Sequence, residues 1–222
     1  MKLVLYASEA GHYNNILDRS LSQLAKKDPV ITFIPASSYQ GEFDFRDFVK
    51  QKKKGSMQKF IYSPIDVPMD EVLKKRILKS DIIHLGGGNT FQFLHALRKA
   101  KFLPDLKAFV QRGGVLSGTS AGAILMTPSV STADFPSFDK DDNDEGIKNF
   151  RAMGLVPFEF FPHYKNSKRY EQAMLARSQK TKIPLYACPD GSGVVIEDSS
   201  IKFVGLFYCF YRGTKQVLPR IL

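Results

Sequence analysis

The chain has 222 residues, of which 43% are hydrophobic and 24% are charged, and its formal net charge is +10. This length and balance are typical of one globular domain, so we expect a single domain over residues 1–222. No apolar run approaches the roughly 20 residues that a membrane span needs, and the apolar start is too short for a signal peptide. We therefore expect no membrane partner.

The positive charge raises the question of a nucleic-acid partner. The lysines are scattered over helix-like segments, and the one dense cluster is Lys50-Gln51-Lys52-Lys53-Lys54. It has no interleaved aromatic side chains that would stack on bases. We interpret this cluster as a solvated helix end and expect no nucleic-acid partner.

Two cysteines, Cys188 and Cys209, lie in apolar runs that resemble strands. Neither belongs to a C-x-x-C pattern or has histidines at zinc spacing. We expect two buried free thiols in a reducing cytoplasm, with no metal and no cofactor.

The first 126 residues alternate predicted strands with predicted helices. Strands are expected over 2–7, 30–35, 59–62, 81–85 and in the apolar run at 115–116. Helices are expected over 14–26, 43–54, 69–79, 90–99, 104–112 and 121–126. In the helix at 69–79, we expect the face toward the core to carry Val72, Leu73, Ile77 and Leu78. Such alternation is typical of βαβ units, so the sequence predicts an α/β fold with a parallel sheet.

The rest of the chain has a different pattern. The pattern of residues 128–150 predicts a long loop with an acidic run at 139–145. This run does not match a calcium-binding loop. In one register Asp144 occupies the position of the required glycine, and in the other Ala152 occupies that of the required glutamate. After a strand near Leu155, we expect segments at 160–163, a helix at 167–179, and strands at 183–188, 194–196 and 201–208. Short strands joined by tight turns indicate antiparallel strands added to the edge of the parallel sheet.

The segment Gly118-Thr119-Ser120-Ala121-Gly122 joins a predicted strand to a predicted helix. A G-x-S-x-G at such a junction is the nucleophile-elbow pattern, in which glycines permit a sharp, strained turn. Ser120 would then expose its hydroxyl above the sheet. An ordinary junction with a helix-capping serine has the same pattern, so the motif alone leaves both interpretations open.

A serine nucleophile needs a base, and the chain has four histidines, His12, His84, His95 and His163. His84 alternates within a buried strand and His95 falls within a helix, which favours structural roles. His12 lies in a polar loop after the first strand. His163 lies in a loop at the end of a strand-like run and is the favoured base.

The base needs a carboxylate, and acyl transfer also needs backbone donors for the oxyanion. Asp190 and Asp134 are the contenders for the carboxylate, although either could be a turn residue. The Ala121 amide is one natural oxyanion donor, and the Gly86-Gly87-Gly88 turn can supply another. A phosphate-binding loop is the competing interpretation of this turn. It is weak, because the turn lacks the last glycine of G-x-G-x-x-G and the Gly-Lys-Ser/Thr of a P-loop.

Three motifs, Gly86-Gly87-Gly88-Asn89-Thr90-Phe91, Gly118-Thr119-Ser120-Ala121-Gly122-Ala123 and Phe161-Pro162-His163, together resemble the peptidase S51 family. The resemblance runs from about residue 80 to 196, and the family contains peptidase E, an aspartyl dipeptidase, and the cyanophycinases. It implies a three-layer α/β sandwich with a mainly parallel central sheet. This fold is similar to class I glutamine amidotransferases, with serine in place of cysteine.

By that resemblance Ser120 matches the nucleophile and His163 the general base. Asp190 matches the position of the triad acid, which is usually glutamate in the family. Asp134 matches a second family aspartate that is also proposed as catalytic.

The resemblance also assigns the surroundings of the nucleophile. Gly88 and Ala121, with the neighbouring Gly87, match the oxyanion hole. Recognition of a substrate carboxylate calls for a cation, and Arg169 is the candidate by position, although its local pattern departs from peptidase E. Asn89 and Thr90 follow the triglycine turn and are further candidates for substrate binding.

We predict a cytoplasmic serine peptidase, monomeric or homodimeric, that acts on small peptides through an acyl-enzyme on Ser120. A cyanophycinase-like or β-aspartyl peptidase is an alternative within the hydrolases. A non-catalytic ligand-binding relative with the same fold is the alternative outside them, and nucleic-acid binding ranks last.

Overall fold

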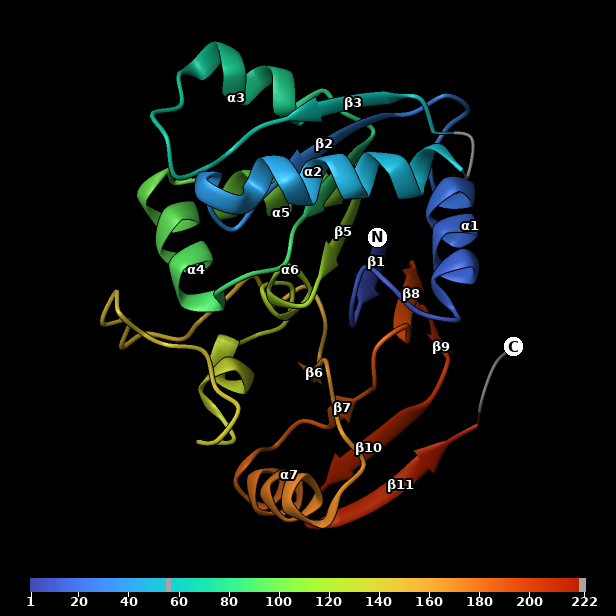
Figure 1. Ribbon diagram of the computed structural model, residues 1–222, viewed down its shortest axis with the longest axis vertical. Coiled ribbons are helices and arrows are strands. Elements are labelled where there is room, and N and C mark those ends of the chain that lie inside the picture. Colours follow the sequence, from blue (N-terminus) through green and yellow to red (C-terminus); the bar gives the residue numbers. More distant parts are fainter. Residues whose placement is uncertain (55–56, 220–222) are drawn as a thin grey trace.

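The computed structural model describes residues 1–54 and 57–219, and its strands form two sheets (Figure 1). The central sheet has seven strands in the order β3-β2-β4-β5-β1-β8-β9. They are β1 (Lys2–Tyr6), β2 (Val30–Ile34), β3 (Lys59–Tyr62), β4 (Ile82–Leu85), β5 (Val115–Thr119), β8 (Gly193–Glu197) and β9 (Ser200–Val204). Strands β1 to β5 pair in parallel, whereas β8 and β9 add antiparallel strands beyond β1. The predicted α/β class with a mainly parallel sheet is confirmed.

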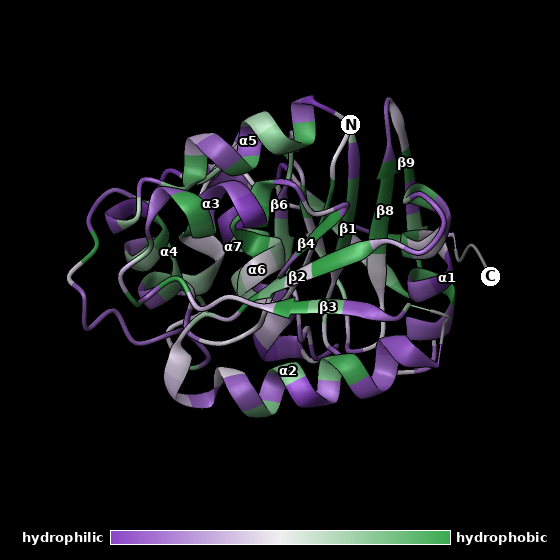
Figure 2. Cartoon of the chain, turned by 90° about the horizontal axis from the view of Figure 1, so that it is seen from above, coloured by the Kyte–Doolittle hydropathy of each residue, from purple (hydrophilic) through white to green (hydrophobic). Residues whose placement is uncertain are grey.

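Helices cover both faces of this sheet. They are α1 (Asn14–Leu24), α2 (Ser38–Lys53), α3 (Glu71–Leu78), α4 (Thr90–Lys99), α5 (Leu103–Gln111) and the short α6 (Ala121–Ile124). Side chains of a strand alternate between faces, so Leu3 and Leu5 pack with α3, α4 and α5, while Val4 and Tyr6 pack with α1 and α2. Figure 2 shows α5 on one side of the strands and α2 on the other.

A smaller mixed sheet lies beside the central one, in the lower part of Figure 1. It contains β6 (Glu159–Phe161), β7 (Leu185–Ala187), β10 (Phe207–Tyr211) and β11 (Thr214–Leu218), with α7 (Lys168–Lys180) packed against it. β6 and β7 are parallel, and the other pairs are antiparallel. Only β8 and β9 therefore extend the central sheet, and the prediction that the later strands would also do so is wrong.

The expected strand at 201–208 is divided at Gly205. This residue has a φ of +91°, and a Cβ there would lie 2.6 Å from Ser192 Oγ. Glycine permits both the backbone angle and the close approach. The chain therefore turns away after β9 and enters β10 in the second sheet.

The expected strand near Leu155 is absent from the described structure, where residues 152–157 are irregular. The backbone amides of Met153, Gly154 and Leu155 donate hydrogen bonds to the carbonyls of Leu125, Thr127 and Met126. These carbonyls belong to the end of α6 and the residues after it. Met153 and Val156 of this segment are buried, but the segment caps a helix end instead of joining a sheet.

Two helix predictions also need correction. α2 begins at Ser38 rather than at residue 43, because the Ser38 amide and hydroxyl donate to the Asp66 carboxylate at 2.8 and 2.9 Å. In α3, Val72 is 77% exposed instead of facing the core, whereas Ile77 is buried. Leu73 and Leu78 pack against the core as predicted, so the error concerns Val72 alone.

The long segment after α6 contains a short 3-10 helix, η1 (Val130–Asp134), and is otherwise irregular through residue 150. Within residues 1–54 and 57–219, no helix is long and apolar enough to cross a membrane. The same residues contain no group of three or more His, Cys, Asp or Glu side chains placed to hold a metal ion.

Candidate active site

Ser120 occupies the turn between β5 and α6 with φ +50° and ψ −110°, a strained conformation for a residue with a side chain. The flanking glycines make the turn possible. A Cβ on Gly118 would lie 2.6 Å from the Gly122 carbonyl carbon, and one on Gly122 would lie 2.2 Å from the Leu85 carbonyl oxygen. The Ser120 amide donates to the Tyr6 carbonyl at 3.0 Å, which fixes the turn to β1.

His163 and Asp190 complete a hydrogen-bonded chain with this serine. His163 Nε2 lies 2.9 Å from Ser120 Oγ, and His163 Nδ1 lies 2.6 Å from Asp190 Oδ1. With an ionised aspartate, the Nδ1–H group donates to the carboxylate and Nε2 accepts from the serine hydroxyl. The aspartate side chain, one methylene shorter than the glutamate that the resemblance implies, therefore reaches the histidine.

Two neighbouring strand ends bring His163 and Asp190 together. His163 follows β6 and Asp190 follows β7, and these strands are parallel neighbours in the smaller sheet. Backbone hydrogen bonds from Tyr164 to Cys188 and from Cys188 to Phe161 hold the two loops side by side. The smaller sheet thus places His163 and Asp190 beside Ser120 of the central sheet.

These two side chains are accessible, with 45% of His163 and 62% of Asp190 exposed. The other predicted acid, Asp134, is exposed at the end of η1 and makes no hydrogen bond to His163 in the described structure. The three joined groups have the order and geometry of a hydroxyl nucleophile, an imidazole base and an orienting carboxylate.

The triglycine turn after β4 lies beside the serine. A Cβ on Gly87 would lie 3.9 Å from Ser120 Cβ, and the Gly122 amide donates to the Gly86 carbonyl at 3.2 Å. Gly88 has a φ of +125°, which favours glycine. Among the described residues, neither the Gly88 nor the Ala121 amide donates to another protein group. Two backbone donors therefore lie near the serine without acceptors.

The three predicted substrate-binding side chains are engaged with the long loop at 128–150. Asn89 caps α4 by accepting from the Gln92 amide and donates to the Asp142 carbonyl. Thr90 is buried, and its amide donates to Asp141 at 2.7 Å. The Arg169 guanidinium lies 3.5 Å from the centre of the Phe138 ring. These contacts attach the acidic loop to α4 and α7, which is a structural task that the sequence did not indicate.

A second polar network, which the sequence did not predict, adjoins the serine turn. Glu9, from the loop after β1, accepts hydrogen bonds from Thr119 at 2.5 Å and from His84 Nε2 at 3.1 Å. His84 Nδ1 lies 2.8 Å from Ser117 Oγ on β5. His84 is fully buried, as its strand position predicted. The network thus contacts Ser117 and Thr119, which lie within three residues of Ser120.

Burial and hydrogen bonding set the charges in this network. Burial lowers the pKa of His84, which leaves its ring neutral. Burial alone would raise the pKa of Glu9, but the hydrogen bond from His84, the charge that His84 carries at acid pH, the Lys52 charge and the hydrogen bond from Thr119 lower it to about 2. A carboxylate that accepts from a neutral imidazole therefore supports the elbow.

Lys52 corrects the interpretation of the basic cluster as a solvated helix end. Its side chain is fully buried, with Nζ 2.6 Å from Asp18 Oδ1 and 4.6 Å from the centre of the Tyr6 ring. Lys53 and Lys54 are exposed, as expected. The spacing of four residues from the buried Phe48 to Lys52 was the available signal, since it places both side chains on one helix face.

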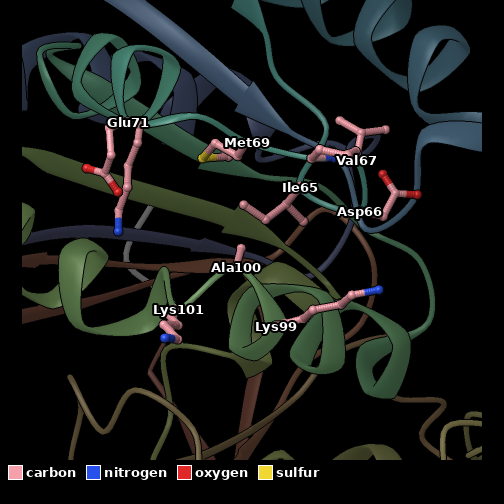
Figure 3. Close-up of a pocket in the computed structure, with 10 residues that line it drawn as sticks. Ile65, Asp66, Val67, Met69, Glu71, Lys99, Ala100 and Lys101 are labelled. Carbon is pink, nitrogen blue, oxygen red and sulfur yellow. The ribbon is translucent and has the colours of Figure 1, made fainter.

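A cavity of about 390 Å³ lies between the segment before α3 and the end of α4 (Figure 3). Its wall carries both acidic and basic side chains, including Asp66, Glu71 and Lys99. Ser120, His163 and Asp190 are not part of its wall, so we do not associate it with the candidate active site.

Comparison with known proteins identifies the family. Residues 3–204 match the model of peptidase family S51. The chain is 28% identical over 197 residues to peptidase E of Nostoc sp., covering 84% of this chain and 77% of that protein. It is 26% identical over 203 residues to an uncharacterized peptidase of Pasteurella multocida, covering 90% and 95%.

A solved structure supports the same fold. The crystal structure of a candidate peptidase E protein from Listeria monocytogenes EGD-e matches with a TM-score of 0.72 and 21% identity, covering 91% of this chain and 96% of that one. At this identity the match concerns the fold. The family model extends over most of the chain, and the chain therefore belongs to peptidase family S51, a serine hydrolase family, with peptidase E among its relatives.

Proposed function

We propose that the protein is a serine-type peptidase that hydrolyses short peptides through an acyl-enzyme on Ser120. The observation that carries the proposal is the chain of hydrogen bonds from Ser120 Oγ to His163 at 2.9 Å and from His163 to Asp190 at 2.6 Å. Family membership and the relatives named peptidase E support a peptide as the substrate.

The first half of the reaction forms the acyl-enzyme. His163 Nε2 takes the proton of the Ser120 hydroxyl while Oγ attacks the substrate carbonyl carbon. The Gly88 and Ala121 amides donate to the oxyanion, and Asp190 stabilises the imidazolium. The protonated His163 then gives its proton to the leaving amine as the carbon–nitrogen bond breaks.

The second half of the reaction repeats these roles with water. His163 takes a proton from water, the hydroxide attacks the ester carbonyl, and the proton returns to Ser120 Oγ as the acid product leaves. We assign the orienting carboxylate to Asp190 and not to Asp134, because only Asp190 is hydrogen-bonded to His163 in the described structure.

We further propose that the chain forms one catalytic domain with the fold of class I glutamine amidotransferases. One apolar core cluster supports this proposal, because it joins Leu3 and Leu5 of the central sheet to Phe160 and Phe207 of the smaller sheet. The free thiols Cys188 and Cys209 fit a protein that works in the reducing cytoplasm.

A serine-directed fluorophosphonate probe and a dipeptide hydrolysis assay test the proposal. The wild-type protein should be labelled at Ser120 and should release amino acids from dipeptides. Ser120→Ala should lose both properties, whereas the exposed Ser199→Ala should keep both. Hydrolysis that persists in a folded Ser120→Ala variant would contradict the mechanism.

Absence of labelling and of hydrolysis in the wild-type protein would favour a non-catalytic relative that binds a ligand. Among hydrolases, the alternative of a cyanophycinase-like or β-aspartyl peptidase is separated by comparing α-linked and β-linked aspartyl dipeptides. Faster cleavage of the β-linked substrate would support that alternative.

A further inference from the structure

A cavity of about 530 Å³ opens beside the serine turn. Thr119, Gly87 and Gly88 form part of its wall, and the middle of α2 contributes Asp44 and Asp47. It is distinct from the cavity in Figure 3, which lies beyond the end of α4.

Ser120, His163 and Asp190 are not part of this wall, but, unlike the wall of the cavity in Figure 3, it includes residues that adjoin Ser120. Thr119 directly precedes the nucleophile, and the position of a Cβ on Gly87 is 3.9 Å from Ser120 Cβ. If the Gly88 amide binds the oxyanion, the substrate residue that carries the attacked carbonyl group lies next to the wall of this cavity. A pocket in that place decides which residue the enzyme accepts on the amino side of the scissile bond.

The charged groups of this cavity are all acidic in the described structure. Glu9, Asp44 and Asp47 contribute carboxylates, and no lysine, arginine or histidine is part of the wall. Asp44 and Asp47 are three residues apart on α2, so they share a helix face, and neither forms an ion pair with a described residue.

The basic groups of the surroundings are committed elsewhere. Lys52 Nζ lies 4.0 Å from Glu9 Oε2, outside the cavity wall, and its closer partner is Asp18 at 2.6 Å. On α2, Arg46 lies near Glu42 and over the Phe43 ring. Arg169 lies over the Phe138 ring.

The carboxylates also affect one another. Burial and the negative charges of Glu9 and Asp47 raise the pKa of Asp44. Asp44 and Asp47 are exposed at the mouth of this cavity. Like charges this close repel, and a bound cation removes that repulsion. An aspartate side chain of a substrate would increase it.

We propose that this cavity is the specificity pocket and that it selects a cationic group. The group is an ammonium or guanidinium carried by the residue on the amino side of the scissile bond, either in its side chain or as its free α-amino group. This inference rests on the proposed peptidase function and names its substrate class: peptides with a positive charge at that residue, rather than with the aspartate that the aspartyl dipeptidases of the family remove.

The test compares kcat/KM for Lys-Ala, Arg-Ala, norleucyl-Ala and Asp-Ala. If the pocket holds a side-chain cation, the lysyl and arginyl substrates should exceed the neutral norleucyl substrate, whose side chain lacks the charged group, by about 10-fold or more. In the double variant Asp44→Asn/Asp47→Asn the ratio of cationic to neutral substrate should fall about 10-fold. The exposed Glu197→Gln is the matched control and should keep the wild-type ratio.

N-acetylated norleucyl-Ala and N-acetylated Lys-Ala distinguish the two sources of the cation. If acetylation abolishes hydrolysis of the neutral substrate and a lysine side chain adds nothing, the pocket holds the α-amino group. If N-acetylated Lys-Ala is still favoured over its neutral counterpart, the pocket holds the side chain.

Binding of Lys-Ala to the Ser120→Ala variant, measured by calorimetry, tests the pocket without turnover. Asp44→Asn/Asp47→Asn introduced into that variant should weaken binding about 10-fold. Preferred hydrolysis of Asp-Ala, or an unchanged ratio and affinity in the double variant, would overturn the inference. Failure of the peptidase function itself would instead appear as no hydrolysis of any dipeptide together with an unlabelled Ser120.

Discussion

Two chains of carboxylate, histidine and hydroxyl groups meet the same strand-to-helix segment, one at Ser120 and the other at Ser117 of β5. The first joins Asp190, His163 and Ser120 at 2.6 and 2.9 Å. In the second, His84 bonds Glu9 at 3.1 Å and a serine hydroxyl of β5 at 2.8 Å. The chemical groups and their distances are alike, so neither property distinguishes a reactive site from a structural one.

The two chains differ in burial. His163 is 45% exposed, and a substrate can reach its Nε2 and the serine. His84 is fully buried between aromatic rings, with the centres of Phe33 and Phe48 at 5.6 and 4.4 Å. Burial lowers the pKa of His84 and both its nitrogens have partners, so it has no access to a substrate proton. The same chemical groups therefore fit the proposed catalytic role where they are open to solvent and a structural role where they are buried.

The largest expected effect separates the two histidines by activity. His163→Ala should lower kcat by about 10⁴- to 10⁶-fold, because the serine loses its base, while the thermal midpoint changes little. Steady-state hydrolysis and a thermal melt measure the two quantities on one preparation. A loss of less than 10-fold in a folded variant would remove His163 from the proposed mechanism.

The next effect separates the two aspartates proposed for the triad. Asp190→Asn should lower kcat by about 10²- to 10⁴-fold, because the amide no longer fixes the imidazole tautomer or stabilises the imidazolium. Asp134→Asn is the matched control and should stay within about threefold of the wild-type kcat, because Asp134 is exposed and not bonded to His163. The reverse order of the two losses would reassign the acid to Asp134.

The open chain could be predicted from the sequence because its members lie at the ends of predicted strands. The glycines around Ser120 indicated the sharp turn, and the loop positions of His163 and Asp190 indicated accessible side chains. Pairing of β6 with β7 is what brings the last two together, and strand pairing of this kind is not encoded in the alternation of apolar residues.

The closed chain could not be predicted because its partners are far apart in sequence and carry no motif. Glu9 and His84 are 75 residues apart, and Glu9 reads as an ordinary polar loop residue. Lys52 reads as one more lysine in a basic cluster, although the helix buries it. The segment near Leu155 was likewise predicted as a strand. Its apolar pattern does not reveal that its amides donate hydrogen bonds to carbonyls at the end of α6.

A third prediction measures what the closed chain contributes to folding. His84→Ala should lower the free energy of unfolding by about 3 kcal/mol, because it leaves a cavity and deprives the Glu9 carboxylate of a donor. Chemical denaturation gives this quantity, and His95→Ala, on the partly exposed face of α4, should change it by less than about 1 kcal/mol. Equal stability of His84→Ala and the wild type would contradict a structural role for the network.

The smallest expected effect is a pH dependence that belongs to the closed chain alone. The pKa of Glu9 in the folded protein is about 2, below its ordinary value near 4.3 in an unfolded chain. A depressed pKa contributes stability above the unfolded value and loses it as the pH falls from about 5 toward 2. The lowered pKa of His84 acts in the same direction but in a higher window, below about 6.5, where the unfolded chain takes up the proton first.

Glu9→Gln isolates the contribution of the carboxylate. Because 37% of the Glu9 side chain is exposed, solvent screening reduces its contribution to about 1 kcal/mol. The wild type should therefore lose about 1 kcal/mol more than Glu9→Gln when urea unfolding is compared at pH 5 and pH 3. A control with the exposed Glu197→Gln should follow the wild type. Equal losses in the wild type and Glu9→Gln would mean that Glu9 titrates as an ordinary surface carboxylate, and that the closed chain holds the nucleophile turn without a charge.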